Sequence, residues 1–175
     1  MTANAPVADL DTRFSSPGAS AIDWAQAEPQ LQNADVFWLS TVRPDGRPHV
    51  APLIGVWQDG GFYFSTGEGE QKAKNLKANN QVAITSGSNA LSEGFDVVVE
   101  GEAVVVNDEG GLRRLADAFE AKYGEYWRLP CREGVLTFGV SPTTAFGFGR
   151  GSADGPPPHG GFSQTRWRFP AGTAR

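Results

Sequence analysis

Aromatic and β-branched residues gather in short stretches that predict β-strands joined by tight turns. Residues 36–42 and 49–57 are two such stretches, and the Arg-Pro-Asp-Gly sequence at 43–46 between them is typical of a hairpin turn. A second turn at 58–61 leads into the apolar stretch 61–66. Three strands that follow one another through tight connections indicate antiparallel pairing.

Further strands are predicted in the second half of the chain. Residues 81–86 form one, and residues 96–106 form a long apolar run that Gly101 interrupts, which predicts a bulge or a barrel bend there. The segments 135–140 and 144–148 are expected to form a final hairpin, followed by a last strand at 163–169. Trp38 and Trp57 lie on early strands and are expected in the core.

Short helices are predicted between these strands. Residues 21–27 have helical spacing limited by Pro29, and residues 70–79 form a short polar helix with Ala73 and Leu76 facing inward. A third helix at 108–124 carries its apolar residues three and four positions apart. Six or seven strands with two or three short helices give an antiparallel α+β fold, and a closed barrel is favoured because closure removes exposed sheet edges.

The N-terminal residues differ in character from the rest of the chain. Residues 1–19 mix small and polar residues without apolar periodicity, which predicts a flexible arm that could be deleted without loss of the fold. Residues 20–170 are then expected to form one domain, a size that can bury a substantial core.

Composition excludes several functional classes. The net charge of -5 comes from 15 basic and 20 acidic residues without a basic block, so nucleic acid is a poor partner. The single cysteine, Cys131, cannot form an internal disulfide, and two histidines are too few for a multi-histidine metal site. We find no signal-peptide pattern and no long apolar run, so the expectation is a cytoplasmic protein without a membrane segment.

A candidate anion site lies where strand 61–66 passes into helix 70–79. The free N–H groups of a helix N-terminus attract anions, and the Thr66 hydroxyl, the Gln71 amide and a lysine at 72 or 74 could add donors. These parts suit one phosphate. Glu68 and Glu70 oppose an anion, and a solvated helix start with exposed lysines is the alternative interpretation.

Three segments in this order, 37–53, 62–66 and 72–76, resemble the pyridoxamine 5′-phosphate oxidase-like split barrels over about residues 34–107. The resemblance implies a six- to seven-stranded antiparallel split β-barrel and a homodimer with two flavin-type cofactors at the subunit interface. It implies that the phosphate binds around Thr66 and Lys72 and that the ring lies against the first two strands. Arg166 and Arg168 lie on a strand that alternates basic and aromatic residues, so they could contact the cofactor or belong to a solvated edge. The candidate cofactor-binding residues are Ser40, Thr41, Pro52, Thr66, Gly67, Gln71, Lys72, Asn75, Arg166 and Arg168.

The chain departs from the vitamin oxidase itself. Gln71-Lys72 stands where that enzyme has an Arg-Lys pair, and its C-terminal Arg-x-His pattern is absent, so oxidation of pyridoxamine phosphate is not expected. The composition and residues 161–169 are similar to actinobacterial relatives that use the deazaflavin coenzyme F-420. Coenzyme F-420 and FMN therefore both stand as candidate cofactors.

The expected activity is hydride transfer between the cofactor ring and a small molecule. This reaction requires no side-chain nucleophile or base, so we assign no catalytic residue and no metal ligand. Two alternatives are a protein that binds a flavin or deazaflavin without turnover, and a haem-binding split barrel with His49 or His159 as axial ligand. The substrate cannot be read from the sequence, because loops around 87–95 and 151–162 are expected to shape the pocket.

Overall fold

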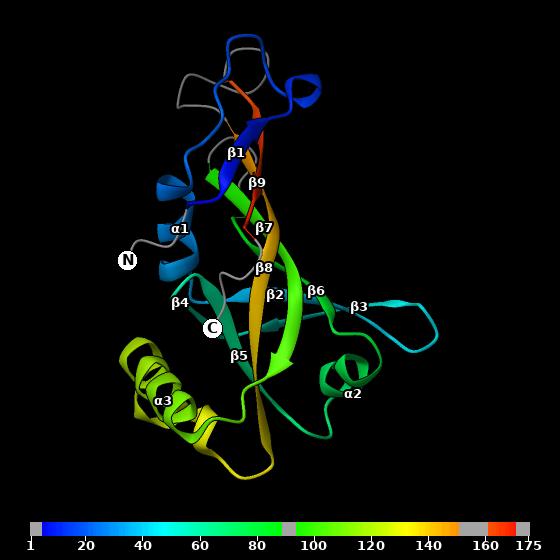
Figure 1. The fold of residues 1–175 in the computed structure, drawn as a ribbon, viewed down its shortest axis with the longest axis vertical. Coiled ribbons are helices and arrows are strands. Elements are labelled where there is room, and N and C mark those ends of the chain that lie inside the picture. Colours follow the sequence, from blue (N-terminus) through cyan, green and yellow to red (C-terminus); the bar gives the residue numbers. More distant parts are fainter. Residues whose placement is uncertain (1–4, 89–93, 151–160, 171–175) are drawn as a thin grey trace.

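The computed structural model describes residues 5–88, 94–150 and 161–170. These residues form a nine-stranded antiparallel sheet with three α-helices and three short 3-10 helices. The main path of the sheet runs β1-β9-β8-β7-β6-β2-β3, and the β4–β5 hairpin joins it through β8. In Figure 1, α1 and α3 lie on one side of the strands and α2 lies on the other.

The strands are β1 (Val7–Leu10), β2 (Phe37–Val42), β3 (Pro48–Leu53), β4 (Gly55–Gln58), β5 (Gly61–Gly67), β6 (Gln81–Ser86), β7 (Gly94–Val105), β8 (Val135–Arg150) and β9 (Ser163–Arg168). The α-helices are α1 (Trp24–Asn33), α2 (Gln71–Ala78) and α3 (Glu109–Tyr123), and the 3-10 helices are η1 (Thr12–Phe14), η2 (Glu125–Trp127) and η3 (Leu129–Cys131). The predicted antiparallel α+β split barrel is confirmed, with more strands than the sequence indicated.

The predicted strand 49–57 is two strands that belong to different parts of the sheet. β3 pairs with β2, whereas β4 pairs with β5. The chain changes direction at Gly55, where a Cβ atom would lie 2.3 Å from the ring of Phe62. Glycine is therefore needed for this close approach.

The bulge predicted at Gly101 is confirmed, because the pairing of β7 with β8 shifts register between Glu100 and Gly101. The predicted final hairpin is wrong, because β8 is one continuous strand from Val135 to Arg150. Pro142 lies opposite Gly101 at the irregularity. A strand tolerates proline at a bulge, where its missing N–H breaks no regular ladder bond, so this proline bends β8 and does not end it.

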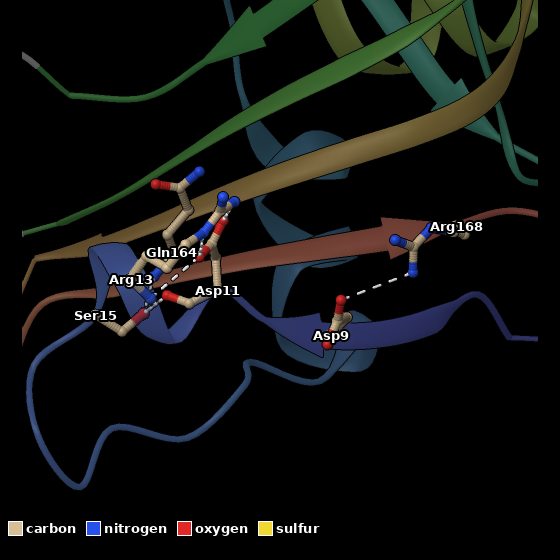
Figure 2. Close-up of polar contacts among 6 residues, drawn as sticks. All are labelled: Asp9, Asp11, Arg13, Ser15, Gln164 and Arg168. Carbon is tan, nitrogen blue, oxygen red and sulfur yellow. Dashed lines mark hydrogen bonds and ion pairs between the residues drawn. The ribbon is translucent and has the colours of Figure 1, made fainter.

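The N-terminal segment differs from the predicted flexible arm in the part that the structure describes. β1 pairs with β9 along its whole length, and the Ser16 amide donates to the carbonyl of Phe162 at 2.8 Å. Figure 2 shows Ser15 beside Gln164, whose backbone amide donates to Ser15 Oγ at 3.0 Å. The side chains of β1 are mostly exposed, so its attachment is through the backbone and leaves no apolar pattern in the sequence.

We expect deletion of residues 1–19 to keep the barrel folded and to lower its stability by about 1–3 kcal/mol, because several backbone hydrogen bonds to β9 are lost. Urea unfolding of the truncated and full-length proteins measures this difference. Deletion of residues 1–4 is the control and should leave the midpoint unchanged. Equal midpoints for all three proteins would show that β1 contributes nothing.

Aromatic residues fill the interior and set the positions of the helices. Phe37, Phe62, Phe64 and Phe138 stack in a buried row between the strands. Trp57 is in this core as predicted, at 5% exposure. On α2, Ala73 and Leu76 are buried as predicted, which seats this helix against β2 and β5.

Candidate functional site

A four-residue turn brings the start of α2 next to the end of β5. The Glu70 amide donates to the Gly67 carbonyl at 3.0 Å, and the Lys74 amide then donates to the Glu70 carbonyl at 3.1 Å as the helix begins. The free N–H groups at the start of α2 therefore lie beside the last residues of β5. This is the segment in which the sequence predicted an anion site.

The turn is closed by an acidic side chain. The Glu70 carboxylate accepts a hydrogen bond from the Gly67 amide at 2.9 Å and forms an ion pair with the ammonium of Lys72. The hydrogen bond from Lys72 is the main reason why the pKa of Glu70 lies below its ordinary value. The Lys72 side chain is 12% exposed, whereas Lys74 two residues later is exposed, so the two lysines are not equivalent.

Thr66, the residue before the turn, has a buried hydroxyl without a partner of normal hydrogen-bond geometry. Thr66 is 3% exposed, and its Oγ1 makes no hydrogen bond with the described residues. The Thr66 hydroxyl makes the smallest contribution to the lowered pKa of Glu70. An unpaired buried hydroxyl costs free energy, which a bound acceptor would recover.

A chain of side-chain hydrogen bonds joins α2 to β2 and β3. The Gln71 amide donates to Asn75 Oδ1 at 2.8 Å, the Asn75 amide donates to Thr41 Oγ1 at 2.9 Å, and Thr41 Oγ1 lies 3.3 Å from Nδ1 of His49. Desolvation, with smaller effects of Arg43 and Lys72, lowers the pKa of His49, which favours the neutral imidazole. Asn75 and Thr41 are thus parts of a network that fixes the helix.

Ser40 and Pro52 lie on the other face of β2 and β3. Successive side chains of a strand alternate between faces, so Ser40 points away from α2, together with Trp38 and Val50. A groove of 390 Å³ passes beside Ser40, Thr41, Pro48, Ala83 and Gly101. Trp38 was predicted in the core, which is wrong, because it is 50% exposed on this face.

Arg166 and Arg168 are far from the turn within one chain. They lie on β9, which pairs with residues 144–149 of β8, whereas the end of β5 before the turn pairs with the opposite end of β8 at Val135. The Arg166 guanidinium lies over the ring of Phe146 at 5.3 Å, and Arg168 forms a long ion pair of 3.8 Å with Asp9, as Figure 2 shows. The structure therefore groups Thr41, Thr66, Gly67, Gln71, Lys72 and Asn75, with Ser40 and Pro52 on the opposite face, and it leaves the two arginines apart.

Two residues of this region were not predicted as parts of the site. Glu70 was treated only as an obstacle to anions, although its position three residues after Gly67 suits a side chain that returns to the turn. His49 was expected to be structural, with a catalytic or haem-ligating role as the alternatives, and its contact with Thr41 follows from their direct pairing across β2 and β3. His159 and most of the predicted pocket loops lie outside the described residues.

The described part of the chain shows neither a metal-binding cluster nor a membrane-spanning helix. Within it, no cluster of three or more His, Cys, Asp or Glu residues could hold a metal ion. No helix among the same residues has both the length and the apolar character needed to cross a membrane.

Comparison with known proteins agrees with this architecture. The family model for pyridoxamine 5′-phosphate oxidase matches residues 24–140, so the chain belongs to this family. No curated protein matches it in sequence.

Solved structures with the same fold have diverse names. A conserved hypothetical protein from Mycobacterium tuberculosis is 18% identical with a TM-score of 0.67, covering 77% of this chain and 89% of its own. A putative 5-nitroimidazole antibiotic resistance protein from Bacteroides thetaiotaomicron is 14% identical with a TM-score of 0.62, covering 94% and 92%. The haem storage protein HutZ from Vibrio cholerae is 21% identical with a TM-score of 0.59, covering 67% and 88%. At these identities the likeness shows the fold alone.

Proposed function

We propose that this protein is an oxidoreductase that binds FMN or coenzyme F-420 with the cofactor's phosphate at residues 66–72. The single observation that carries the proposal is the buried hydroxyl of Thr66 near the end of β5, which makes no hydrogen bond of normal geometry with the described residues, in the segment that leads to the partly buried ammonium of Lys72 on α2. A hydroxyl, an ammonium and free helix N–H groups are the donors that a phosphate monoester or diester accepts. The family of the chain supports the same assignment.

The residues of the turn fit such a group. Thr66 Oγ1 and Lys72 Nζ would donate to the phosphate, and the Gln71–Asn75–Thr41 chain would hold α2 in place against the sheet. The bound ring would supply hydride transfer to or from a small molecule, while the protein contributes orientation and exclusion of water. Ser40 and Pro52 are the proposed contacts of the ring on the outer face of β2 and β3.

The outer face of the sheet supports a homodimer. Cross-strand pairing places a row of residues side by side from β3 to β9, namely Pro52, Trp38, Thr85, Val98, Phe146 and Arg166. Trp38 and the neighbouring Val50 are 50% and 55% exposed, so large apolar side chains face solvent in a single chain. Neighbouring exposed apolar side chains such as Trp38 and Val50 on one face of a sheet support an interface there. In the proposed dimer, Arg166 and Arg168 would act as contacts from the partner's sheet.

Replacing Trp38 by glutamate is expected to convert a dimer into a monomer and to weaken cofactor binding, because a charge at the centre of the proposed interface would be desolvated. Sedimentation equilibrium at micromolar concentration measures the mass. Tyr126→Glu is the control, because Tyr126 is also a large aromatic residue and is 71% exposed on η2, away from β2. A wild-type monomer that still holds cofactor would remove the interface from the proposal.

Three measurements test the function itself. Mass spectrometry of the small molecule released on denaturation should find FMN or F-420, and fluorescence titration should then give the affinity of each. Steady-state reduction of candidate acceptors by the loaded protein distinguishes an oxidoreductase from a protein that only binds the cofactor. Purified protein that binds neither compound would refute the proposal.

Haem binding is a second candidate, favoured by the neutral imidazole of His49 and by the haem storage name of HutZ. His49 Nδ1 lies by Thr41 Oγ1, so Nε2 would be the ligating atom. A Soret band in the purified or haem-reconstituted protein, lost in His49→Ala, would support this function. Its absence after reconstitution would exclude it.

A further inference from the structure

Glu70 occupies the place in the turn where an external anion would be held. One carboxylate oxygen accepts from the Gly67 amide at 2.9 Å, and the other pairs with Lys72. The Cβ of a residue larger than glycine at position 67 would lie 3.4 Å from the first of these oxygens, so the carboxylate is packed closely over the turn. The backbone amide and the ammonium that could bind a phosphate already bind a carboxylate.

The hydroxyl of Thr66 points independently to a ligand with more acceptor atoms. Thr66 is 3% exposed and Oγ1 has no partner of normal geometry, although the carboxylate is close by. In this turn the two carboxylate oxygens accept from Gly67 and Lys72, and neither accepts a hydrogen bond of normal geometry from Thr66 within the described residues. A phosphate group presents three or more acceptor oxygens and could accept from Thr66 as well.

We propose that Glu70 is an internal competitor of phosphate: its carboxylate fills the turn until a ligand that also binds elsewhere on the protein displaces it. This inference rests on the proposed function for the identity of that ligand. Glu70 is tethered to the turn, so the effective concentration of its carboxylate there is in the millimolar range or above. A free phosphate makes no other contacts that could offset the cost of displacing this carboxylate. A phosphorylated cofactor gains further free energy from its ring. The cost of displacing Glu70 is the same for both ligands, and it leaves inorganic phosphate weakly bound while the cofactor still binds through its additional contacts.

The opposite role for Glu70 is to hold Lys72 in the position that binds phosphate. Both roles predict the same contacts without a ligand, but they predict opposite effects of neutralising the carboxylate. A competitor that loses its charge leaves Lys72 free and strengthens phosphate binding. A positioning residue that loses its charge leaves Lys72 misplaced and weakens it.

The test compares Glu70→Gln and Glu70→Ala with wild type, and Glu68→Gln serves as the control. Glu68 precedes Glu70 on the same exposed turn, and its side chain makes no ion pair with the described lysines and arginines. The probes are inorganic phosphate, FMN and riboflavin, which lacks the phosphate. Calorimetry and thermal shift measure binding of phosphate, and fluorescence measures binding of the two flavins.

We expect both Glu70 variants to bind inorganic phosphate roughly tenfold more tightly than wild type and FMN more tightly by a similar factor. Riboflavin affinity should be unchanged, and Glu68→Gln should behave as wild type. The side chain of Glu70 is 52% exposed, so both variants are expected to fold. The alanine variant separates the loss of charge from any effect of a new amide group.

Each other outcome is decisive. Weaker binding of phosphate and FMN by both variants would assign the positioning role and overturn the proposal, and so would unchanged binding. If no variant binds FMN but the Glu70 variants bind phosphate more tightly than wild type, the proposed flavin function fails while the competition by Glu70 stands.

Discussion

Lys72→Ala is expected to weaken binding of FMN or F-420 by about ten- to a hundredfold, whereas Lys74→Ala costs a few-fold at most. A charge-assisted hydrogen bond to a phosphate contributes roughly 1.5–3 kcal/mol, which corresponds to this loss of affinity. Lys72 is mostly buried beside the turn, and its removal would also leave Glu70 unpaired near the phosphate. Lys74 is exposed on the next part of the helix and supplies a matched control.

Titration of both coenzymes into both variants by fluorescence measures these effects. Because the interaction is partly Coulombic, affinity should fall with rising salt, and the Lys72 variant should be less sensitive to salt than wild type. The melting temperatures of the two variants should be similar. Small and equal effects of the two substitutions would show that the phosphate is held elsewhere.

Gly101→Ala is expected to destabilise the fold by about 3 kcal/mol, because the bulge leaves no space for a side chain. A Cβ atom at this position would lie 2.2 Å from the carbonyl oxygen of Ser141, and this oxygen belongs to the backbone of the paired strand. The two strands would have to separate locally to relieve the overlap. The same region borders the groove beside Ser40, so cofactor binding should weaken as well.

Urea unfolding of Gly101→Ala measures the loss of stability. Gly69→Ala is the control, because a Cβ at Gly69 meets no atom within 4 Å. A midpoint for Gly101→Ala that equals the control would mean that β7 and β8 can move apart at the bulge without cost, contrary to their continuous pairing on both sides of it.

Local sequence patterns predicted those parts of the fold that depend on neighbouring residues. The hairpin of β2 and β3 follows from its turn residues, and the bulge at Gly101 follows from a glycine within an apolar run. The seating of α2 follows from the spacing of Ala73 and Leu76. The difference between Lys72 and Lys74 follows from their places on one short helix.

Features that depend on distant pairing could not be predicted in the same way. β1 pairs with β9 through its backbone, so its exposed side chains carry no signal of it. From the sequence alone, Pro142 indicates a turn. Only the pairing across the sheet shows that it lies opposite Gly101, at a bulge where a strand can contain proline. Trp38 has the same apolar character whether it faces the core or the exposed side of the sheet, and only the alternation along β2 in the fold decides between them.

The continuity of β8 has a consequence for the order in which the protein assembles during synthesis. Among the described strands, β5 pairs only with β4 and β8, so the β4–β5 hairpin is joined to the remaining sheet through a strand that begins at Val135. Chains are made from the N-terminus at about 5–20 residues per second, so this hairpin waits several seconds with an unpaired edge while later residues emerge. A nascent chain stalled before residue 135 should therefore expose β5 to proteases and chaperones. Once synthesis has passed residue 150 and β8 is free to pair, β5 should be protected.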